Sequence, residues 1–275
     1  MVKEIEQLEK ALPIIQRELK KRPPTIGLIG LSGVGKSSTI NRLFKTNLAT
    51  SDTVACTKEF EHKDIELKLT NSTIQNYPVQ LRVIDAPGLG EDINLDPQYL
   101  QMYKENLGRC DVIVWVLAAR NRAVALDQQY LQELEEFHNK IVFALHQIDL
   151  VEPLNWNIEY NIPSPKQKKN IEVILQDKKE KLSAVIKKDV KMIEYSSRTG
   201  FGLEQLFAAI INSCPEERTW IFNGLKGFSY KEYTPKIVLD ELEKRNNGKV
   251  SVGKSWLENW LEILENLLEM LNPFK

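Results

Sequence analysis

The chain has 275 residues, of which 42% are hydrophobic and 27% are charged, a composition typical of a soluble globular protein. Its 37 Lys and Arg nearly balance its 38 Asp and Glu, which argues against a nucleic-acid or membrane partner recognised by bulk charge. The N-terminus is charged, no run approaches the ~20 apolar residues of a membrane-spanning helix, and the cysteines are far apart, so we expect a cytoplasmic protein.

A helical segment is predicted over residues 1–22. An apolar stripe at alternating spacings of three and four residues is typical of a helix, and it comprises Ile5, Leu8, Leu12, Ile15 and Leu19. Pro13 interrupts the stripe, which indicates a kinked helix or one that restarts at the proline. The consecutive prolines of "KKRPPT" then predict a hinge.

Strand and helix patterns alternate over residues 23–214, which predicts an α/β domain with a mostly parallel sheet and helices on both faces. The strand patterns are "TIGLIG", "EFEHKDIELKLT", "VQLRVID", "DVIVWVLAA", "IVFALHQID" and "KMIEYSS". The second and third flank a turn-rich stretch and predict an antiparallel hairpin. Lys36 to Phe44 open the first helix of this domain, and "GLEQLFAAIINS" is the last.

Residues 215–275 form a C-terminal extension that ends in a strongly amphipathic helical pattern, "SWLENWLEILENLLEMLNPF". Glu258, Glu262, Glu265 and Glu269 fall on one stripe, and Trp and Leu side chains fall on the opposite half. Three interpretations stay open: packing against this chain's own domain, binding to a partner or a second copy, and association with a membrane. The acidic polar face argues against the membrane.

A phosphate-binding loop is predicted between the first strand and its helix. Gly30, Gly35, Lys36 and Ser37 match the pattern G-x-x-x-x-G-K-[ST] in the strand–loop–helix context that this motif requires. Glycines let backbone N–H groups point at phosphate oxygens, Lys36 would neutralise the β- and γ-phosphates, and the Ser37 hydroxyl would bind Mg²⁺. The predicted phosphate contacts are Gly30, Ser32, Gly33, Val34, Gly35, Lys36, Ser37 and Ser38.

A second motif, "VIDAPGLGED", follows the predicted hairpin. Asp85 at the end of its strand can hold a water on Mg²⁺, and the N–H of Gly88 can meet the γ-phosphate. Its position some fifty residues after the phosphate loop strengthens an otherwise weak D-x-x-G pattern.

With these motifs the stretch from Thr25 to Ser213 resembles the Ras-like, translation-factor class of P-loop GTPases. "GKSSTIN" and "DAPGLGED" look most like the Era-like branch, in particular its YfjP-like bacterial members; septins and immunity-associated GTPases are more distant. The resemblance implies a six-stranded Ras-like G domain that binds GTP or GDP with Mg²⁺. Here it would be flanked by the N- and C-terminal helices.

The resemblance also implies a threonine that joins Mg²⁺ when GTP is bound. "LATSDTVACTKEF" offers Thr50, Thr53 and Thr57, and the position before the next strand favours Thr57 over Thr53, with an ordinary surface loop as the alternative. The predicted metal ligands are therefore Ser37, Thr57 and Asp85, and the predicted catalytic residues are Lys36, Thr57 and Gly88.

The base-recognition motif Asn-Lys-x-Asp of these GTPases has a partial match in "HQID". Asp149 is retained, and its carboxylate can accept two hydrogen bonds from guanine that adenine does not offer, so we expect GTP rather than ATP. Gln147 replaces the lysine whose stem covers the base. His146 replaces an asparagine that ties this loop to the phosphate loop, and these departures predict a weaker nucleotide affinity.

The last motif of the family, Ser-Ala-Lys, corresponds to Ser196, Ser197 and Arg198 in "YSSRTGFGLEQL". A backbone N–H of this loop bonds the guanine O6 in the family, so the exchange of alanine for Ser197 is expected to be harmless. Ser197 and Arg198 join Gln147 and Asp149 as predicted base contacts.

Hydrolysis is expected to be slow, because Leu89 stands where Ras has its water-positioning glutamine. Arg120 or Arg122 could act as an arginine finger across a homodimer, but solvated loop arginines are the plainer interpretation. We expect a GTPase switch in which segments 48–58 and 88–95 respond to the γ-phosphate and signal to an effector protein. An oligomerising scaffold with little hydrolysis and an ATP-dependent enzyme are the alternatives.

Overall fold

A computed structural model of the chain describes residue 17 and residues 20–48, 60–69, 77–90 and 96–215. The chain divides into two units, Met1–Pro23 with Val238–Lys275, and Pro24–Ile237. Of the first unit, only Arg17 and residues 20–23 are among the described residues. The second unit contains the predicted phosphate loop and base-recognition loops.

A six-stranded sheet forms the centre of the second unit, in the order β2-β3-β1-β4-β5-β8. The strands are β1 (Thr25–Ile29), β2 (Glu61–Leu69), β3 (Tyr77–Asp85), β4 (Val112–Ala118), β5 (Ile141–His146) and β8 (Met192–Glu194). Only the edge strand β2 is antiparallel to its neighbour in this sheet, and it pairs with β3 as expected for the predicted hairpin. The predicted mostly parallel sheet is therefore confirmed.

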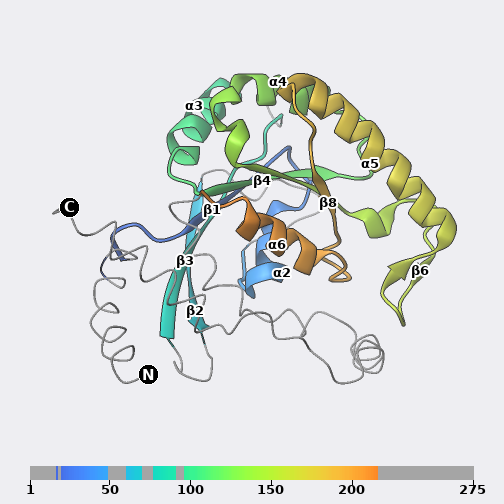
Figure 1. The fold of residues 1–275 in the computed structure, drawn as a ribbon, viewed down its shortest axis with the longest axis horizontal. Helices are drawn as coiled ribbons and strands as arrows, with labels where there is room; N and C mark the ends of the chain where they lie inside the picture. Colours follow the sequence, from blue (N-terminus) through green and yellow to red (C-terminus); the bar gives the residue numbers. More distant parts are fainter. Residues whose placement is uncertain (1–16, 18–19, 49–59, 70–76, 91–95, 216–275) are drawn as a thin grey trace, which may run out of the picture. The chain divides into compact units, whose positions relative to one another are not determined.

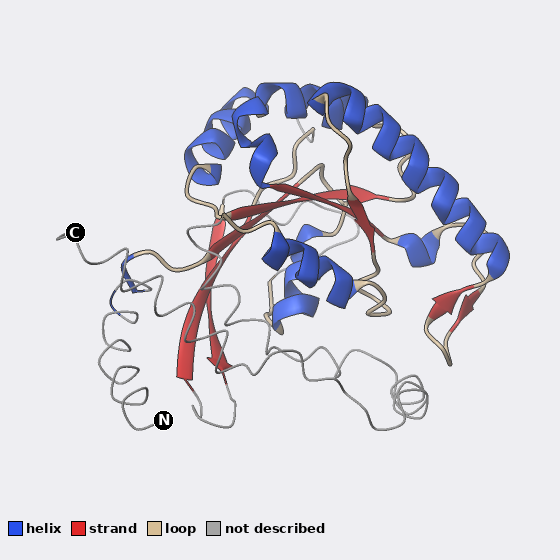
Figure 2. Cartoon of the chain, viewed as in Figure 1, coloured by secondary structure: helices blue, strands red, loops and turns tan. Residues whose placement is uncertain are grey.

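Helices cover both faces of this sheet, as predicted (Figures 1 and 2). On one face lie α2 (Lys36–Phe44) and α6 (Leu203–Asn212). On the opposite face lie α3 (Asp96–Leu107), α4 (Ala125–Glu133) and α5 (Pro165–Ile186). Because the helix after β1 and the helix after β3 lie on opposite faces, the phosphate loop occupies the point where ligands bind in open α/β sheets.

The central strands β1 and β4 are buried over their whole length, which is why their sequences are continuous apolar runs. Trp115 of β4 has no exposed surface, and its indole N–H donates to a buried carboxylate oxygen of Asp127 in α4, 2.9 Å away. The free thiol of Cys110, just before β4, is also buried, and burial raises its pKa to about 12. Within the described ranges, no helix is both long and apolar enough to cross a membrane.

Two short 3-10 helices and a small hairpin complete the described unit. Glu135–Lys140 precedes β5, and η2 (Ile148–Leu150) follows it directly. The hairpin pairs β6 (Trp156–Asn157) with β7 (Ile162–Pro163) and was not predicted, because two-residue strands give no periodic signal. It lies between the base-recognition loop and α5, whose start is set by the Ser164 cap and by Pro165 in the first turn.

Candidate functional site: a nucleotide-binding edge of the sheet

The phosphate loop, Gly30–Ser37, connects the end of β1 to α2 and adopts a conformation that requires its glycines. Gly30, Gly33 and Gly35 have φ values of 141°, 71° and 91°. A Cβ on Gly30 would lie 2.3 Å from the Val116 carbonyl oxygen, so only glycine fits there. The loop therefore has the curled backbone that presents N–H groups to an anion at the start of a helix.

Lys36 lies at the start of α2 and turns its ammonium back over the loop. Its Nζ donates to the carbonyl oxygens of Gly30 and Leu31 at 3.2 and 3.1 Å, and the side chain is 6% exposed. Ser38 follows on the same helix and is half-buried. The predicted phosphate contacts thus come together on one short segment, with the lysine directed along the loop.

Ser37 and Asp85 meet at the base of this loop. The Ser37 hydroxyl donates to Oδ2 of Asp85 at 2.6 Å, and Asp85 is 1% exposed at the end of β3. A hydroxyl and a carboxylate are hard oxygen ligands of the kind Mg²⁺ prefers, and Mg²⁺ in nucleotide sites takes most of its other ligands from water and phosphate. These two residues fit the ion.

The loop after β3 is pinned to the phosphate loop by its backbone. The Leu89 N–H donates to the Gly30 carbonyl at 3.3 Å, and the Ser32 N–H donates to the Leu89 carbonyl at 3.1 Å. Leu89 also forms a parallel bridge with Leu31 and is 1% exposed. Gly88 is therefore held beside the phosphate loop, whereas the Leu89 side chain is buried and offers no polar group to a water.

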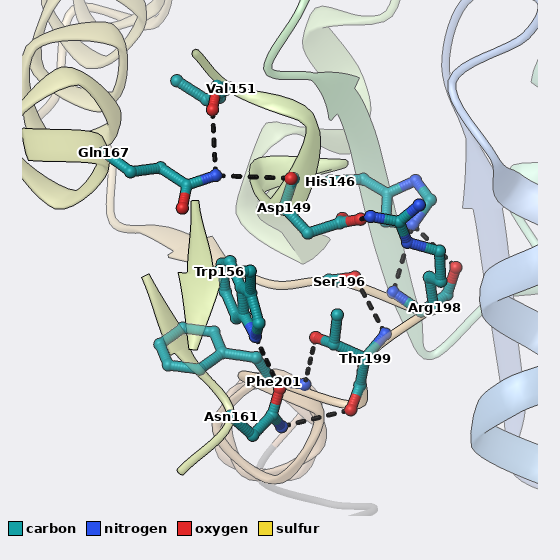
Figure 3. Close-up of polar contacts among 11 residues, drawn as sticks. His146, Asp149, Val151, Trp156, Asn161, Gln167, Ser196, Arg198, Thr199 and Phe201 are labelled. Carbon is teal, nitrogen blue, oxygen red and sulfur yellow. Dashed lines mark hydrogen bonds and ion pairs between the residues drawn. The ribbon is translucent and has the colours of Figure 1, made fainter. Parts of the chain in front are cut away.

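Asp149 lies in η2, immediately after β5, and is 4% exposed. Gln167 of α5, itself fully buried, donates from Nε2 to the carbonyl oxygens of Asp149 and Val151 at 3.3 and 2.9 Å (Figure 3). This contact fixes the backbone of the loop. Gln147, in a left-handed conformation, reaches the Gly33 carbonyl at 3.4 Å, so the loop also touches the phosphate loop.

The loop between β8 and α6 brings Arg198 to Asp149. The Arg198 Nη2 lies 2.7 Å from Asp149 Oδ2, and its side chain is 67% exposed against 3% for that of Asp149. Ser196 is fully buried and its Oγ accepts from the Thr199 N–H, which closes the loop on itself. The predicted base contacts Asp149 and Arg198 are thus in contact with each other.

His146 makes the contacts that the sequence assigned to an asparagine. Its Nδ1 lies 2.7 Å from the Val34 carbonyl oxygen, and its Nε2 lies 2.8 Å from the Ser197 hydroxyl and 3.2 Å from the Ser197 N–H. The replacement of asparagine therefore does not remove the tie to the phosphate loop. Ser197, expected to be merely harmless, is the second partner of this tie.

The β6–β7 hairpin, which the sequence did not predict, supports the loop between β8 and α6. Asn161 donates from Nδ2 to the Thr199 carbonyl at 3.1 Å and accepts from the Trp156 indole N–H at 3.0 Å (Figure 3). Trp156 packs edge-on against Phe201, with ring centroids 5.4 Å apart. Gln167 and this hairpin carry no local motif, so only the tertiary structure reveals their role.

Arg120 and Arg122 line a cavity of about 840 Å³ together with residues 150–152, Leu154 and residues of α5. Lys178 of α5 lies in the same cavity, and its Nζ donates to the Asn121 carbonyl at 2.7 Å. Burial lowers the pKa of Lys178, and the nearby Asp127 carboxylate opposes this shift. The two arginines therefore lie beside α5, and an arginine finger across a dimer stays a hypothesis.

Several predicted features lie outside the described residues. They are Thr57 with its alternatives Thr50 and Thr53, the rest of segment 49–58, residues 91–95, and the C-terminal amphipathic pattern.

Comparison with known proteins agrees with the resemblance expected from the motifs. Residues 25–147 match the family model described as "50S ribosome-binding GTPase". The matched segment, somewhat less than half of the chain, is similar to the P-loop GTPases of this family. Its relatives include the uncharacterized protein YfjP of Escherichia coli K12, 33% identical over 157 residues that cover 56% of this chain and 50% of YfjP. The chain thus spans about half the length of this curated relative.

Solved structures share the fold of this GTPase domain. Era of Aquifex aeolicus, solved with GDP.AlF4-, has a TM-score of 0.53 and 19% identity, over 70% of this chain and 57% of Era. The chloroplast translocon structure of atToc33 and psToc159 has a TM-score of 0.55 and 18% identity, over 78% of this chain and 92% of the other. At such identities the likeness concerns the fold alone, and it agrees with the predicted Ras-like G domain.

Proposed function

We propose that this GTPase domain binds Mg²⁺ with GTP or GDP, hydrolyses GTP slowly, and acts as a conformational switch. The observation that carries the proposal is the 2.6 Å contact between the Ser37 hydroxyl and the Asp85 carboxylate beneath the phosphate loop. It brings together the hydroxyl that would bind Mg²⁺ and the carboxylate that would hold a water on the ion. Bound there, Mg²⁺ would neutralise charge on the β- and γ-phosphates.

The phosphate groups would lie against the curled backbone between Gly30 and Lys36. Lys36 now donates to two loop carbonyls, and phosphate oxygens are stronger acceptors for its ammonium. Thr57 is proposed as the third ligand of Mg²⁺ and Gly88 as a γ-phosphate contact. The backbone ties between Leu89 and the phosphate loop support the second assignment.

The choice of guanine is proposed to rest on Asp149. Its carboxylate can accept from N1–H and from the 2-amino group of guanine, a pair of donors that adenine lacks. The ion pair with Arg198 neutralises this buried carboxylate, and guanine would displace the arginine from Oδ2. Arg198 and Gln147 would then be available to cover the faces of the base.

Slow hydrolysis follows from Leu89. A buried leucine in place of a water-positioning glutamine leaves the attacking water without a polar partner from this residue. A group supplied in trans would complete the site, and a homodimer is the simplest source. The chloroplast translocon components, for which dimerization is reported as important for GTPase activity, share the fold and make this arrangement plausible.

The buried Leu89 also favours a second candidate function, a nucleotide-gated scaffold that oligomerises and hardly hydrolyses GTP. In both functions, loss of the γ-phosphate would release segments 48–58 and 88–95, and an effector protein would detect the change.

Equilibrium binding of fluorescent GTP and GDP with Mg²⁺ tests the proposal, beside phosphate release and competition by ATP. We expect Lys36→Ala to weaken binding at least about tenfold, because a charge-assisted contact is lost. Asp149→Asn should weaken GTP binding at least about 100-fold. It should also gain affinity for xanthosine triphosphate, whose 2-carbonyl accepts where guanine donates. Effective competition by ATP, or unchanged GTP binding by Asp149→Asn, would contradict the proposal.

A further inference from the structure

The two nitrogens of His146 have different partners, and these partners define its protonation state. The Val34 carbonyl can only accept a hydrogen bond, so Nδ1, 2.7 Å away, carries a proton. The Ser197 backbone N–H can only donate, so Nε2, 3.2 Å away, carries a lone pair. The neutral Nδ1–H tautomer is therefore the form that satisfies both contacts.

The imidazole lies against the phosphate loop because Gly35 has no side chain. A Cβ there would come within 2.4 Å of the His146 ring atoms Cε1 and Nδ1. On its other side the ring stacks on Tyr195, with centroids 4.7 Å apart. The Tyr195 hydroxyl lies 2.7 Å from the Thr39 hydroxyl, which in turn donates to the Gly35 carbonyl. His146 thus packs between the phosphate loop and Tyr195, which is itself linked back to this loop through Thr39.

We propose that His146 is a positioning residue for the nucleotide: in its neutral form it holds the phosphate loop, the base-recognition loop and the β8–α6 loop in one arrangement. This inference rests on the proposed nucleotide function and adds a regulation to it. The imidazole supplies one donor and one acceptor, as an asparagine amide would, but unlike the amide it can take up a proton as the pH falls. Nucleotide binding consequently becomes sensitive to acid.

A second proton would sit on Nε2 and face the Ser197 N–H, so two donors would oppose each other. The Ser197 hydroxyl can turn to accept, but the backbone N–H cannot, and the β8–α6 loop must shift. Burial lowers the pKa of His146, while the hydrogen bond to Val34 and the Asp149 carboxylate act in the opposite direction. The neutral form therefore prevails at neutral pH and is lost as the pH falls below the usual histidine range.

Within the described part of the chain, the charged or titratable side chains that matter around His146 are Asp149, Arg198, Tyr195 and Lys36. Asp149 lies on its own loop and is paired with Arg198 of the β8–α6 loop. Tyr195 is fully buried, and burial raises its pKa, so it stays neutral. Lys36 of α2 directs its ammonium to loop carbonyls.

The first test compares three variants by GDP binding at about pH 7.5. His146→Asn keeps one donor and one acceptor, and should bind GDP within about threefold of the wild type. His146→Phe keeps the stacked ring without its nitrogens, and His146→Ala removes both. These two should lose at least about tenfold in affinity. Wild-type affinity in His146→Phe would overturn the inference, and circular dichroism excludes simple unfolding.

The second test is the pH profile of the wild type beside that of His146→Asn. Both proteins share the titration of the nucleotide phosphates, so the difference between the two profiles isolates the imidazole. As the pH falls from about 7.5 to about 4.5, well below the usual histidine pKa of about 6.5, the dissociation constant of the wild type should rise at least about fivefold more than that of the variant. Superimposed profiles, or a steeper profile for the variant, would overturn the inference.

A third measurement does not depend on the nucleotide. Nitrogen-15 NMR of labelled histidines, with His146→Asn to assign the signals among three histidines, reports which ring nitrogen carries the proton. We expect the Nδ1–H tautomer in the nucleotide-free protein, and an Nε2–H or doubly protonated ring at neutral pH would refute the inference. If the wild type binds no GTP but shows this tautomer, the proposed function fails and the His146 contacts stand.

Discussion

Gly33 and Gly35 lie two residues apart in the phosphate loop, and both have positive φ, yet their surroundings differ. A Cβ on Gly33 would meet nothing within 4 Å, whereas a Cβ on Gly35 would collide with the His146 ring. Alanine at either position carries the cost of a left-handed conformation, about 1 kcal/mol. Only alanine at Gly35 must also displace the imidazole, which adds roughly 1–3 kcal/mol.

Gly35→Ala should therefore lower the free energy of unfolding clearly more than its matched control, Gly33→Ala. Chemical denaturation of the nucleotide-free variants measures the difference. Equal losses for the two variants would mean that the His146 ring moves aside freely, contrary to its close contact with the loop.

At the scale of elements, α5 is the support of the base-recognition loop. Gln167 near its start bonds two loop carbonyls, and its burial makes this contact costly to lose. Gln176 lies on the exposed side of the same helix, and its side chain donates to Glu180 one turn further along. The two residues have the same side chain and lie in the same helix, so they differ mainly in the contacts that they make.

Gln167→Ala should cost about 1–3 kcal/mol of stability, because two buried carbonyls lose their donor. It should also weaken GDP binding, because the backbone under Asp149 loses its anchor. The matched control Gln176→Ala should change stability by less than about 0.5 kcal/mol. Thermal unfolding and GDP titration of both variants test this prediction. Similar losses of stability and of GDP affinity in the two variants would show that the Gln167 contacts contribute little.

For the molecule as a whole, we expect that a single chain does not complete its own catalytic site. Leu89 is buried and provides no polar group, so we expect the rate of GTP hydrolysis per chain to rise with protein concentration. Phosphate release over a range of concentrations, with light scattering in GTP, GDP and no nucleotide, tests this. Lys36→Ala serves as the inactive control. A flat, low rate from a protein that still binds GTP would favour the scaffold or a partner protein.

Much of the fold follows from local pattern. The buried strands β1 and β4 are continuous apolar runs, and the β2–β3 hairpin flanks a turn-rich stretch, so their order along the chain predicted the sheet. The hairpin β6–β7 was not predicted, because its strands are too short to show a periodic pattern. Its contact with the loop after β8 is also a tertiary contact, which no local pattern indicates.

Sequence motifs were sufficient to predict the phosphate loop, the Ser37 and Asp85 pair and the position of Asp149, because each belongs to a motif whose spacing is set by one strand and one turn. The contacts of His146 could be seen only in the folded protein. Its partners lie 112 and 51 residues away in the chain, on two other loops. When a residue departs from a motif, the contact of the usual residue seems to be lost until the neighbours of the new residue are known. Here the neighbours offer one acceptor and one donor, and a neutral imidazole satisfies both.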